Sequence, residues 1–465
     1  MSRTDQVHDA DEGATGTAGS LLLLGLLAPL AGLGAGVIGA LFRWVLARAN
    51  QFRDALIAHL GHSGVGGFVL LVALAAMATA IAAWLAKRIA PSAAGSGIPR
   101  VEAVLREQVE PAPLRVIPVK FVAGTLAIGS GLALGREGPS VQMGASIAYH
   151  LGRLFRRSWA DCRALLAAGA GAGLATAFNA PIAGALFVLE RLVRRFEARM
   201  AMVSLAASAV AIWVARALLG NTPDDRVHAL LSPGVVQEPL YLLLGVAAGF
   251  AGMLYNRTVL AGLGITDRLG GLPVELRAAI VGAAVGSIAW FAPGMVGGGD
   301  AVAQQALDGM GGLAVIPLIF LFRLLLIACS VSSGAPGGLL APFLVLGAEL
   351  GVWFGKLFAL LLPALAIQPE AFALVGMAAL FAGILRAPLT GIVLVTEMTN
   401  DATLLLPMIV ACSAAMLVPA LFGNSSILDA LGARALARRD RHARVMPGQG
   451  PRTMNQAPGA DDRPR

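Results

Sequence analysis

Three glycine-rich segments have the composition of anion-binding helix starts. They are residues 95–99 (GSGIP), 135–139 (GREGP) and 334–342 (GAPGGLLAP), and an apolar segment follows each of them. In the first two, proline stands where a first helical turn tolerates the loss of its N–H group. A helix start presents unpaired N–H groups and about half a positive charge, which attract an anion without trapping it. The candidate anion-binding residues of these two segments are Ser96, Gly97, Ile98, Arg136 and Gly138.

Glu137 is the residue that could gate such a site. A carboxylate at membrane depth costs several kcal/mol unless it is paired or in contact with water. Arg136 is one available partner, but a carboxylate at a helix N-terminus would also compete with an anion for the same N–H donors. The ionised side chain would block the pathway, and the protonated side chain would swing out and admit an anion.

The elements that position these segments must be membrane helices. Apolar residues make up 57% of the 465 positions and charged residues only 13%, so the solvent of this chain is the bilayer. Continuous apolar runs such as residues 21–27 favour helices over the alternating strands of a barrel. The clearest apolar stretches are residues 20–46, 66–85, 203–219, 240–254, 313–331 and 404–421. We therefore predict an all-α polytopic membrane protein in which some helices span the membrane only partly.

An internal repeat divides the chain into two related halves. Residues 169–190 can be laid over residues 376–397, and both segments carry the pattern A-P-x-x-G-x-x-x-x-x-E. Ala180, Pro181, Gly184 and Glu190 then coincide with Ala387, Pro388, Gly391 and Glu397. Repeated halves with interrupted helices are typical of transporters. We predict a membrane domain over residues 19–439, with halves of about 19–200 and 201–439, between disordered tails at 1–18 and 440–465.

Charge distribution sets the expected orientation and excludes several functions. The net charge is +8, and arginines crowd the C-terminal tail and the loops near residues 153–157 and 194–195. The positive-inside rule places these segments in the cytoplasm. No basic stripe carries the interleaved aromatic residues of a nucleic-acid site. Three cysteines without a CxxC pair and six histidines without ligand spacing predict no metal site, and we expect no cofactor and no catalytic residues.

The three segments, together with the repeat, resemble the CLC family of chloride channels and proton/chloride exchangers over roughly residues 21–438. The resemblance implies a CLC-type inverted-repeat fold of many tilted, partly membrane-spanning helices, assembled as a homodimer with one pore per subunit. It also implies that Ser96 coordinates the anion, that Glu137 is the gating glutamate, and that the N–H groups of Leu339 and Leu340 bind the anion. Lys120 and Glu102 match charged positions of the family, for which we expect supporting roles.

The inner proton route departs from the family pattern. In exchangers of the family a second glutamate relays protons just after the F-N-A-P helix, and here that position is Arg191, with Glu190 one residue earlier. One residue turns a helix by about 100°, so Glu190 would face elsewhere unless the helix end rotates. Arginine cannot shuttle protons at neutral pH. The candidates for a proton pathway are Glu190, Arg191 and Glu102.

The inner gate departs as well, because Leu428 stands where the family has a tyrosine whose hydroxyl helps to hold the anion. These two departures lead us to prefer a passive or loosely proton-coupled conduit for chloride or similar small anions. The alternative is a stoichiometric proton/chloride exchanger. A fluoride exporter is less favoured because Ser96 is retained, and an enzyme or a scaffold lacks the residues or the module that it would need.

The expected surroundings follow from this function. We predict a multi-pass protein of the bacterial inner membrane with both termini in the cytoplasm. Its expected partners are chloride or other small anions, protons in the exchanger alternative, membrane lipids and a second copy of the chain.

Overall fold

The structure is a computed structural model that describes residues 18–220, 234–268 and 271–445. Within these ranges the long elements are all helices, and one isolated bridge joins Gly135 to Gly338. The predicted all-α class is confirmed. Five helical segments of the described chain are long and apolar enough to cross a membrane: Leu22–Arg88, Ala198–Leu219, Glu238–Arg268, Val274–Phe291 and Leu340–Leu361.

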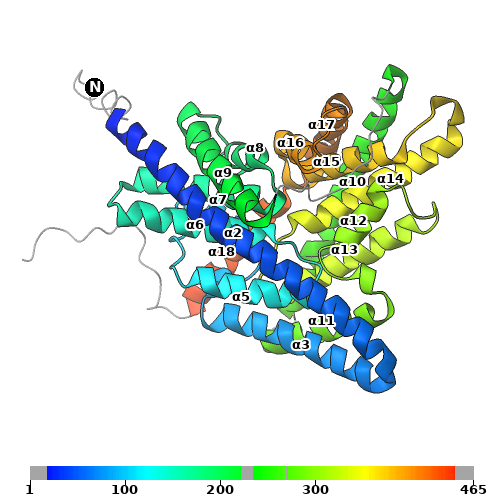
Figure 1. The fold of residues 1–465 in the computed structure, drawn as a ribbon, viewed down its shortest axis with the longest axis horizontal. Coiled ribbons are helices and arrows are strands. Elements are labelled where there is room, and N and C mark those ends of the chain that lie inside the picture. The colour runs from blue at the N-terminus through cyan, green and yellow to red at the C-terminus, as the bar shows by residue number, and fades with distance from the viewer. Residues whose placement is uncertain (1–17, 221–233, 269–270, 446–465) are drawn as a thin grey trace, which may run out of the picture.

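The helices form two consecutive sets, followed by one last helix (Figure 1). The first set is α2 (Ala18–Leu60), α3 (Gly64–Arg88), α4 (Ile98–Leu105), α5 (Val116–Gly129), α6 (Glu137–Leu154), α7 (Trp159–Phe178), α8 (Pro181–Phe187) and α9 (Ala198–Leu219). The second set is α10 (Glu238–Arg268), α11 (Val274–Phe291), α12 (Asp300–Leu307), α13 (Ile316–Ser332), α14 (Leu340–Leu361), α15 (Pro369–Leu385), α16 (Pro388–Thr399) and α17 (Leu405–Leu421). The chain then enters α18 (Ile427–Val445).

The two sets pack in the same way, as the sequence repeat predicts. The helix α6 packs on α7 as α14 packs on α15, and α2 packs on α9 as α10 packs on α17. The most extensive contacts between the two sets are those of α3 with α11 and of α8 with α16 (Figure 1). Because α9 packs on α2, α7 and α8, we place the end of the first half after Leu219, later than the boundary expected at about residue 200.

The expected domain edges at residues 19 and 439 stay predictions. The first described helix begins at Ala18, and α18 continues to Val445, beyond the expected edge at residue 439. We expected residues 1–18 and 440–465 to be disordered, and of these segments residues 1–17 and 446–465 lie outside the described residues.

The repeated A-P pattern ends one helix and starts the next. Asn179 ends α7 with a φ of 55°, and Arg386 ends α15 with a φ of 63°. In both places an alanine with non-helical backbone angles follows, and proline then occupies the first helical turn. A left-handed residue terminates a helix, and proline costs nothing at the next helix start. The short local pattern therefore creates the broken helices of both halves.

Glycine allows close helix contacts at equivalent places of the two halves. A Cβ atom on Gly144 of α6 would collide with the carbonyl of Gly169 on α7. A Cβ atom on Gly347 of α14 would lie 2.6 Å from the carbonyl of Gly376 on α15. Small residues let membrane helices approach to this distance. This packing explains why Gly169 and Gly376 coincide in the sequence repeat.

The repeated glutamates cap each other's short helices. Glu190, in the π-helical turn Val188–Leu192, accepts hydrogen bonds from the N–H groups of Leu389 and Thr390 at 3.0 and 2.7 Å, at the start of α16. Glu397 of α16 accepts hydrogen bonds from Ile182 and Ala183 at 3.1 and 2.8 Å, at the start of α8. A carboxylate at a helix N-terminus satisfies unpaired donors and the helix dipole. The two repeated glutamates thus cap each other's helices across the boundary between the halves, and these hydrogen bonds join the two halves.

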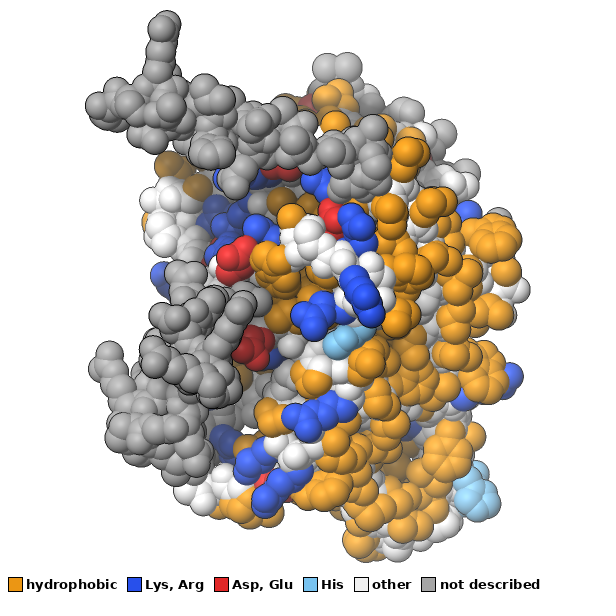
Figure 2. Space-filling view, turned by 90° about the vertical axis from the view of Figure 1, so that its left-hand side faces the viewer, with side chains coloured by type: hydrophobic (Ala, Val, Ile, Leu, Met, Phe, Trp, Pro, Cys, Tyr) orange, Lys and Arg blue, Asp and Glu red, His pale blue; other side chains and the backbone are white. Residues whose placement is uncertain are grey.

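The surface of the molecule agrees with a membrane location. In Figure 2 hydrophobic side chains cover a broad area of the right-hand side, and Lys and Arg side chains gather toward the left. Large apolar side chains with high exposure include Leu22, Leu26, Trp213, Leu325 and Leu417. Contact with lipid chains is favourable for such an apolar surface, whereas its contact with water costs free energy.

Candidate anion-binding site

Three helix starts meet at the centre of the molecule. Gly135, just before α6, and Gly338, just before α14, exchange backbone hydrogen bonds of 2.9 and 2.6 Å. A Cβ atom on Gly138 would lie 2.9 Å from the Cα atom of Gly338 and from the hydroxyl of Ser96, just before α4. The three glycine-rich segments found in the sequence therefore touch, with their unpaired N–H groups in one place.

The Glu137 carboxylate occupies this meeting point. Glu137 is fully buried, and its Oε1 atom accepts a hydrogen bond of 2.6 Å from the N–H group of Leu340, at the start of α14. A Cβ atom on Gly135 or Gly338 would collide with the carboxylate in this position, so glycine at both places leaves room for the side chain. The side chain thus takes a helix N-terminus that could otherwise bind an anion.

Two buried oxygens at the site have no hydrogen-bond partner among the described residues. They are the hydroxyl of Ser96 and the Oε2 atom of Glu137. Buried polar atoms are almost always paired, and those that are not point to a missing ion, water or function. A serine hydroxyl can donate to an anion, and the second carboxylate oxygen can take a proton.

Two cavities approach the Glu137 region, and Leu134 lines both of them. The α12 cavity has a volume of about 280 Å³ and is lined by Arg136, Gly135 and Asp300, among others. The α18 cavity has a volume of about 460 Å³, and Ser96, Gly97 and Leu339 are in its wall, with residues of α18. The helix starts thus lie between two open spaces.

The candidate anion-binding residues divide between these spaces. Ser96, Gly97 and Leu339 face the α18 cavity, while Ile98 is buried at the start of α4. Arg136 lines the α12 cavity and donates a hydrogen bond of 2.8 Å to the carbonyl of Ala177. The guanidinium is therefore placed at a mouth of the site and not at the meeting point itself.

Lys120 supports the loop that presents Ser96. Its side chain is fully buried and donates hydrogen bonds to the carbonyls of Ala93 at 2.8 Å and Gly95 at 2.7 Å. The structure thus gives Lys120 the supporting position that the resemblance implied. Both carbonyls lie just before α4, so the ammonium group fixes the approach to that helix start.

Replacing Lys120 with methionine should loosen this loop, because two carbonyls lose their charged donor. Each unsatisfied buried group costs about 1–3 kcal/mol, so we expect a lower melting temperature and about tenfold weaker chloride binding by calorimetry. Lys87→Met is the control, because Lys87 is half exposed and its nearest carboxylate, on Glu275, is 3.8 Å away. Equal effects of the two substitutions would contradict the role of Lys120.

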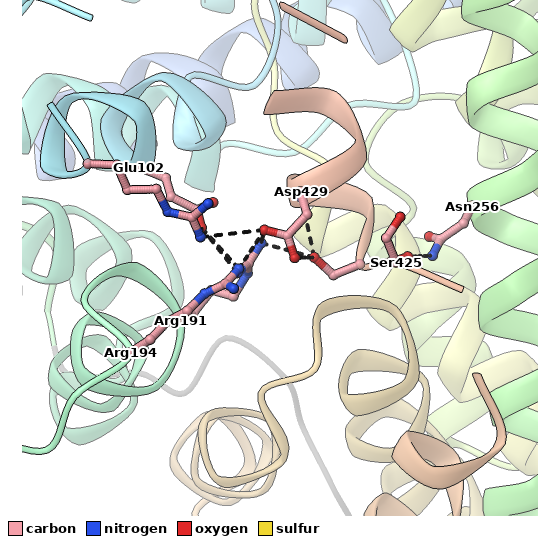
Figure 3. Close-up of polar contacts among 8 residues, drawn as sticks. Glu102, Arg191, Arg194, Asn256, Ser425 and Asp429 are labelled. Carbon is pink, nitrogen blue, oxygen red and sulfur yellow. Dashed lines mark hydrogen bonds and ion pairs between the residues drawn. The ribbon is translucent and has the colours of Figure 1, made fainter. Parts of the chain in front are cut away.

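Glu102 and Arg191 lie in one group of charges, which we name the inner charge cluster (Figure 3). Its members are Glu102, Arg106, Arg191, Arg194 and Asp429. Glu102 lies 2.5 Å from Arg106, 3.2 Å from Arg191 and 3.1 Å from Arg194. Asp429 of α18 lies 3.1 Å from Arg191. Glu190 is not part of this cluster, since it caps α16.

Leu428 is buried at the start of α18, next to Asp429. The two positions that depart from the family pattern, 191 and 428, therefore belong to one region of the fold. The α18 cavity is lined by Leu431 and Gly432, the next residues along this helix face.

Two buried residues near the site were missed in the sequence. Arg323 is fully buried and donates to the carbonyls of Met295 and Gly298 at 2.9 and 2.8 Å, beside the α12 cavity. Its signal was a single arginine within the apolar run 313–331. Tyr255 of α10 is buried, packs against Phe343 of α14 and has a hydroxyl without a hydrogen-bond partner among the described residues. Nothing in the local sequence marked this tyrosine.

Comparisons with known proteins agree on the fold. A family model described as voltage gated chloride channel matches residues 78–420. A protein of Cronobacter sakazakii named H(+)/Cl(−) exchange transporter ClcA is 38% identical over 89% of this chain and 90% of its own length. A slow cyanobacterial Cl−/H+ antiporter of known structure has a TM-score of 0.85 and 32% identity, over 90% of this chain and 99% of that chain. A CLC-type fluoride/proton antiporter has a TM-score of 0.75 at 23% identity, over 86% and 96% of the two chains, and shares the fold.

Proposed function

Because the chain belongs to the CLC family of voltage gated chloride channels, we propose that it exchanges protons for chloride across the membrane. The observation that carries this proposal is the Glu137 carboxylate, bound to the N–H group of Leu340 between two cavities. The names of its relatives favour an exchanger over the passive or loosely coupled conduit that we preferred from the sequence.

Chloride would pass through the helix starts of α4, α6 and α14. The N–H groups there and the Ser96 hydroxyl can replace part of the hydration shell of the anion. None of these donors carries a full charge, so the anion can leave again. Arg136, at the wall of the α12 cavity, adds a positive charge that attracts anions toward the site without touching the meeting point.

Glu137 would couple the two ions. While it is ionised, its carboxylate holds the N–H group of Leu340 and excludes chloride from that position. A proton on the free Oε2 atom removes the negative charge and weakens the acceptor. The side chain can then leave the N–H donors to chloride and release its proton on the other side.

Glu102 is the carboxylate that we assign to the inner end of the proton route. It is buried in the inner charge cluster and lies on α4, the helix whose start carries Ser96. Arg191 cannot take this role, because a guanidinium does not give up its proton near neutral pH. Glu190 is committed to capping α16 through two N–H groups and the hydroxyl of Thr390.

Glutamine substitutions separate these two carboxylates. We expect Glu102→Gln to slow chloride-driven proton movement by about tenfold or more while chloride flux continues, because a relay has lost its titrating group. Glu190→Gln should keep proton movement and lower the melting temperature, because it weakens a charged helix cap. Proton flux and thermal unfolding of the reconstituted variants measure both effects. Loss of proton movement in Glu190→Gln alone would reverse the assignment.

A passive or loosely coupled conduit is the second candidate. It is favoured by the fixed positive charge of Arg191 where exchangers of the family carry a proton-relaying glutamate, and by the absence of a hydroxyl at Leu428. A fluoride exporter is the third and weakest candidate, because Ser96 is retained and because the fluoride/proton antiporter, at 23% identity, is similar in fold alone.

The surroundings of the transporter complete the proposal. We assign the α18 cavity and the inner charge cluster to the cytoplasmic side of a bacterial inner membrane, because arginines gather there. Membrane lipids would cover the exposed apolar surface, and two copies of the chain would form a homodimer with separate pathways. Crosslinking in native membranes and labelling of the termini from each side test these assignments.

The decisive test of exchange uses the purified protein in liposomes. A chloride gradient is imposed without a proton gradient, and the pH inside is followed with a dye. An exchanger moves protons uphill at the expense of the chloride gradient. Chloride flux without proton movement would support the conduit, and no flux of either ion would reject both.

A further inference from the structure

The start of α18 is held by the side chain of Arg191. Its Nη2 atom donates to the hydroxyl of Ser426 at 3.0 Å and to a carboxylate oxygen of Asp429 at 3.1 Å. Ser426 in turn donates to Asp429 at 2.7 Å and accepts a hydrogen bond from its N–H group at 3.3 Å, which caps α18. Leu428 lies between these two residues, so Arg191 binds both sides of the inner-gate position.

The same arginine also reaches a second element. Its Nη1 atom donates to Glu102 of α4 at 3.2 Å, so Arg191 connects the start of α18 to the helix whose own start carries Ser96. The Arg191 side chain is 3% exposed. Removing one partner of a buried charge pair leaves the other charge uncompensated, which is strongly unfavourable.

The opposite side of the same segment is anchored in the second half. Asn256 of α10 donates to the side chain of Asn424 at 3.0 Å and to the carbonyl of Ser425 at 3.1 Å. Arg386 donates to the carbonyl of Asn424 at 2.5 Å. Figure 3 shows this segment between Arg191, which donates to Asp429 on one side, and Asn256, which donates to Ser425 on the other. Residues 424–429 are thus fixed from both halves, and Arg191 supplies the buried connection on the first.

We propose that Arg191 is a positioning residue that holds the start of α18, with Leu428, in place and so limits the width of the α18 cavity through which anions reach Ser96. This inference rests on the proposed function for the anion pathway, but its geometry does not depend on proton coupling. If Arg191 were only a surface charge at the edge of the membrane, its side chain would be exposed. Instead it is buried and has three hydrogen-bonded partners. Arg191 and Asp429 carry opposite charges and attract each other, whereas a glutamate at position 191 would repel Asp429.

The test measures access to position 428 directly. Leu428→Cys is introduced together with Cys329→Ser, which removes the cysteine that is exposed in the structure. The full-length protein is reconstituted in liposomes and treated on both sides with a membrane-impermeant thiol reagent. We expect Arg191→Gln to increase the modification rate of the introduced thiol by about tenfold or more, since it opens a buried charge pair. Arg191→Lys should restore slow modification in part, because the charge remains while the fork geometry is lost.

Arg194 provides a matched control. It contacts the same two carboxylates, Glu102 at 3.1 Å and Asp429 at 2.5 Å, but its side chain is 43% exposed. Exposed ion pairs contribute little, so Arg194→Gln should change the modification rate by less than about threefold. Equal rates in the Arg191→Gln and Arg194→Gln proteins would overturn the inference.

Asp429→Asn keeps the test decisive if the Arg191 variant does not fold. In this variant Arg191 is intact but has lost one of its partners. The thiol at position 428 should therefore react faster than in the protein that carries only Leu428→Cys and Cys329→Ser. An unchanged rate in folded Asp429→Asn protein would reject the inference. Chloride flux is measured in the same liposomes, and its absence in the wild-type protein would reject the proposed function without affecting the accessibility result.

Discussion

Glu137→Ala protein is expected to lose chloride-driven proton movement by about a hundredfold or more, which is the scale of removing a general acid or base. Chloride flux should continue, because alanine leaves the N–H group of Leu340 free for an anion. The wild-type flux should rise as the pH falls, because protonation of Glu137 opens the pathway. The variant should lose this pH dependence, since nothing titrates at the meeting point of the helices.

The matched control is Glu397→Ala, which removes a half-buried carboxylate that accepts hydrogen bonds at another helix N-terminus, the start of α8. It should lower stability and leave the pH dependence of flux in place. Parallel measurements of proton and chloride flux at several pH values give both results. If Glu137→Ala protein kept chloride-driven proton movement, Glu137 would not be the coupling residue.

Gly138→Ala is the second substitution with a large expected effect. Its Cβ atom would collide with the carbonyl of Ser96 and lie 2.9 Å from the Cα atom of Gly338. Backbone cannot move aside as a flexible side chain can, and overpacking of this kind costs about 1–3 kcal/mol. The three helix starts must separate, so we expect chloride binding and flux to fall by about tenfold or more.

Gly264→Ala is the control for this substitution, because Gly264 of α10 has no neighbouring atom within 4 Å of an added Cβ. It should leave chloride flux unchanged and can raise the helix propensity. Titration calorimetry and flux in liposomes distinguish lost affinity from lost folding. Normal chloride affinity in Gly138→Ala protein would show that the helix starts do not form the binding site.

Much of the fold was predictable from the sequence because its signals are local. Proline and glycine mark where helices start, and the A-P pattern at Pro181 and Pro388 exposed the repeat. The function of the repeated glutamates was not predictable in the same way. Glu190 and Glu397 each cap a helix in the other half, and such a contact arises only when the two halves pack together.

The residues of the candidate site also divide into those that a local motif reveals and those that only the packing of distant segments brings together. The three helix starts and Glu137 were found because each carries its own motif. In the sequence Arg191 and Leu428 are two separate departures from the family pattern, but the structure joins them through Asp429 and Ser426, far along the chain from Arg191. The sequence preference for a conduit rested on those two residues, whereas the exchangers among the relatives favour proton coupling.

The most direct test of the account is a crystal structure of Glu137→Gln protein grown in bromide, which scatters anomalously. We predict a bromide peak at the position of the missing carboxylate charge, within hydrogen-bond distance of the N–H group of Leu340 and near the Ser96 hydroxyl. A structure in which bromide binds only beside Arg136, with the helix starts empty, would contradict the central claim that these N-termini form the anion site.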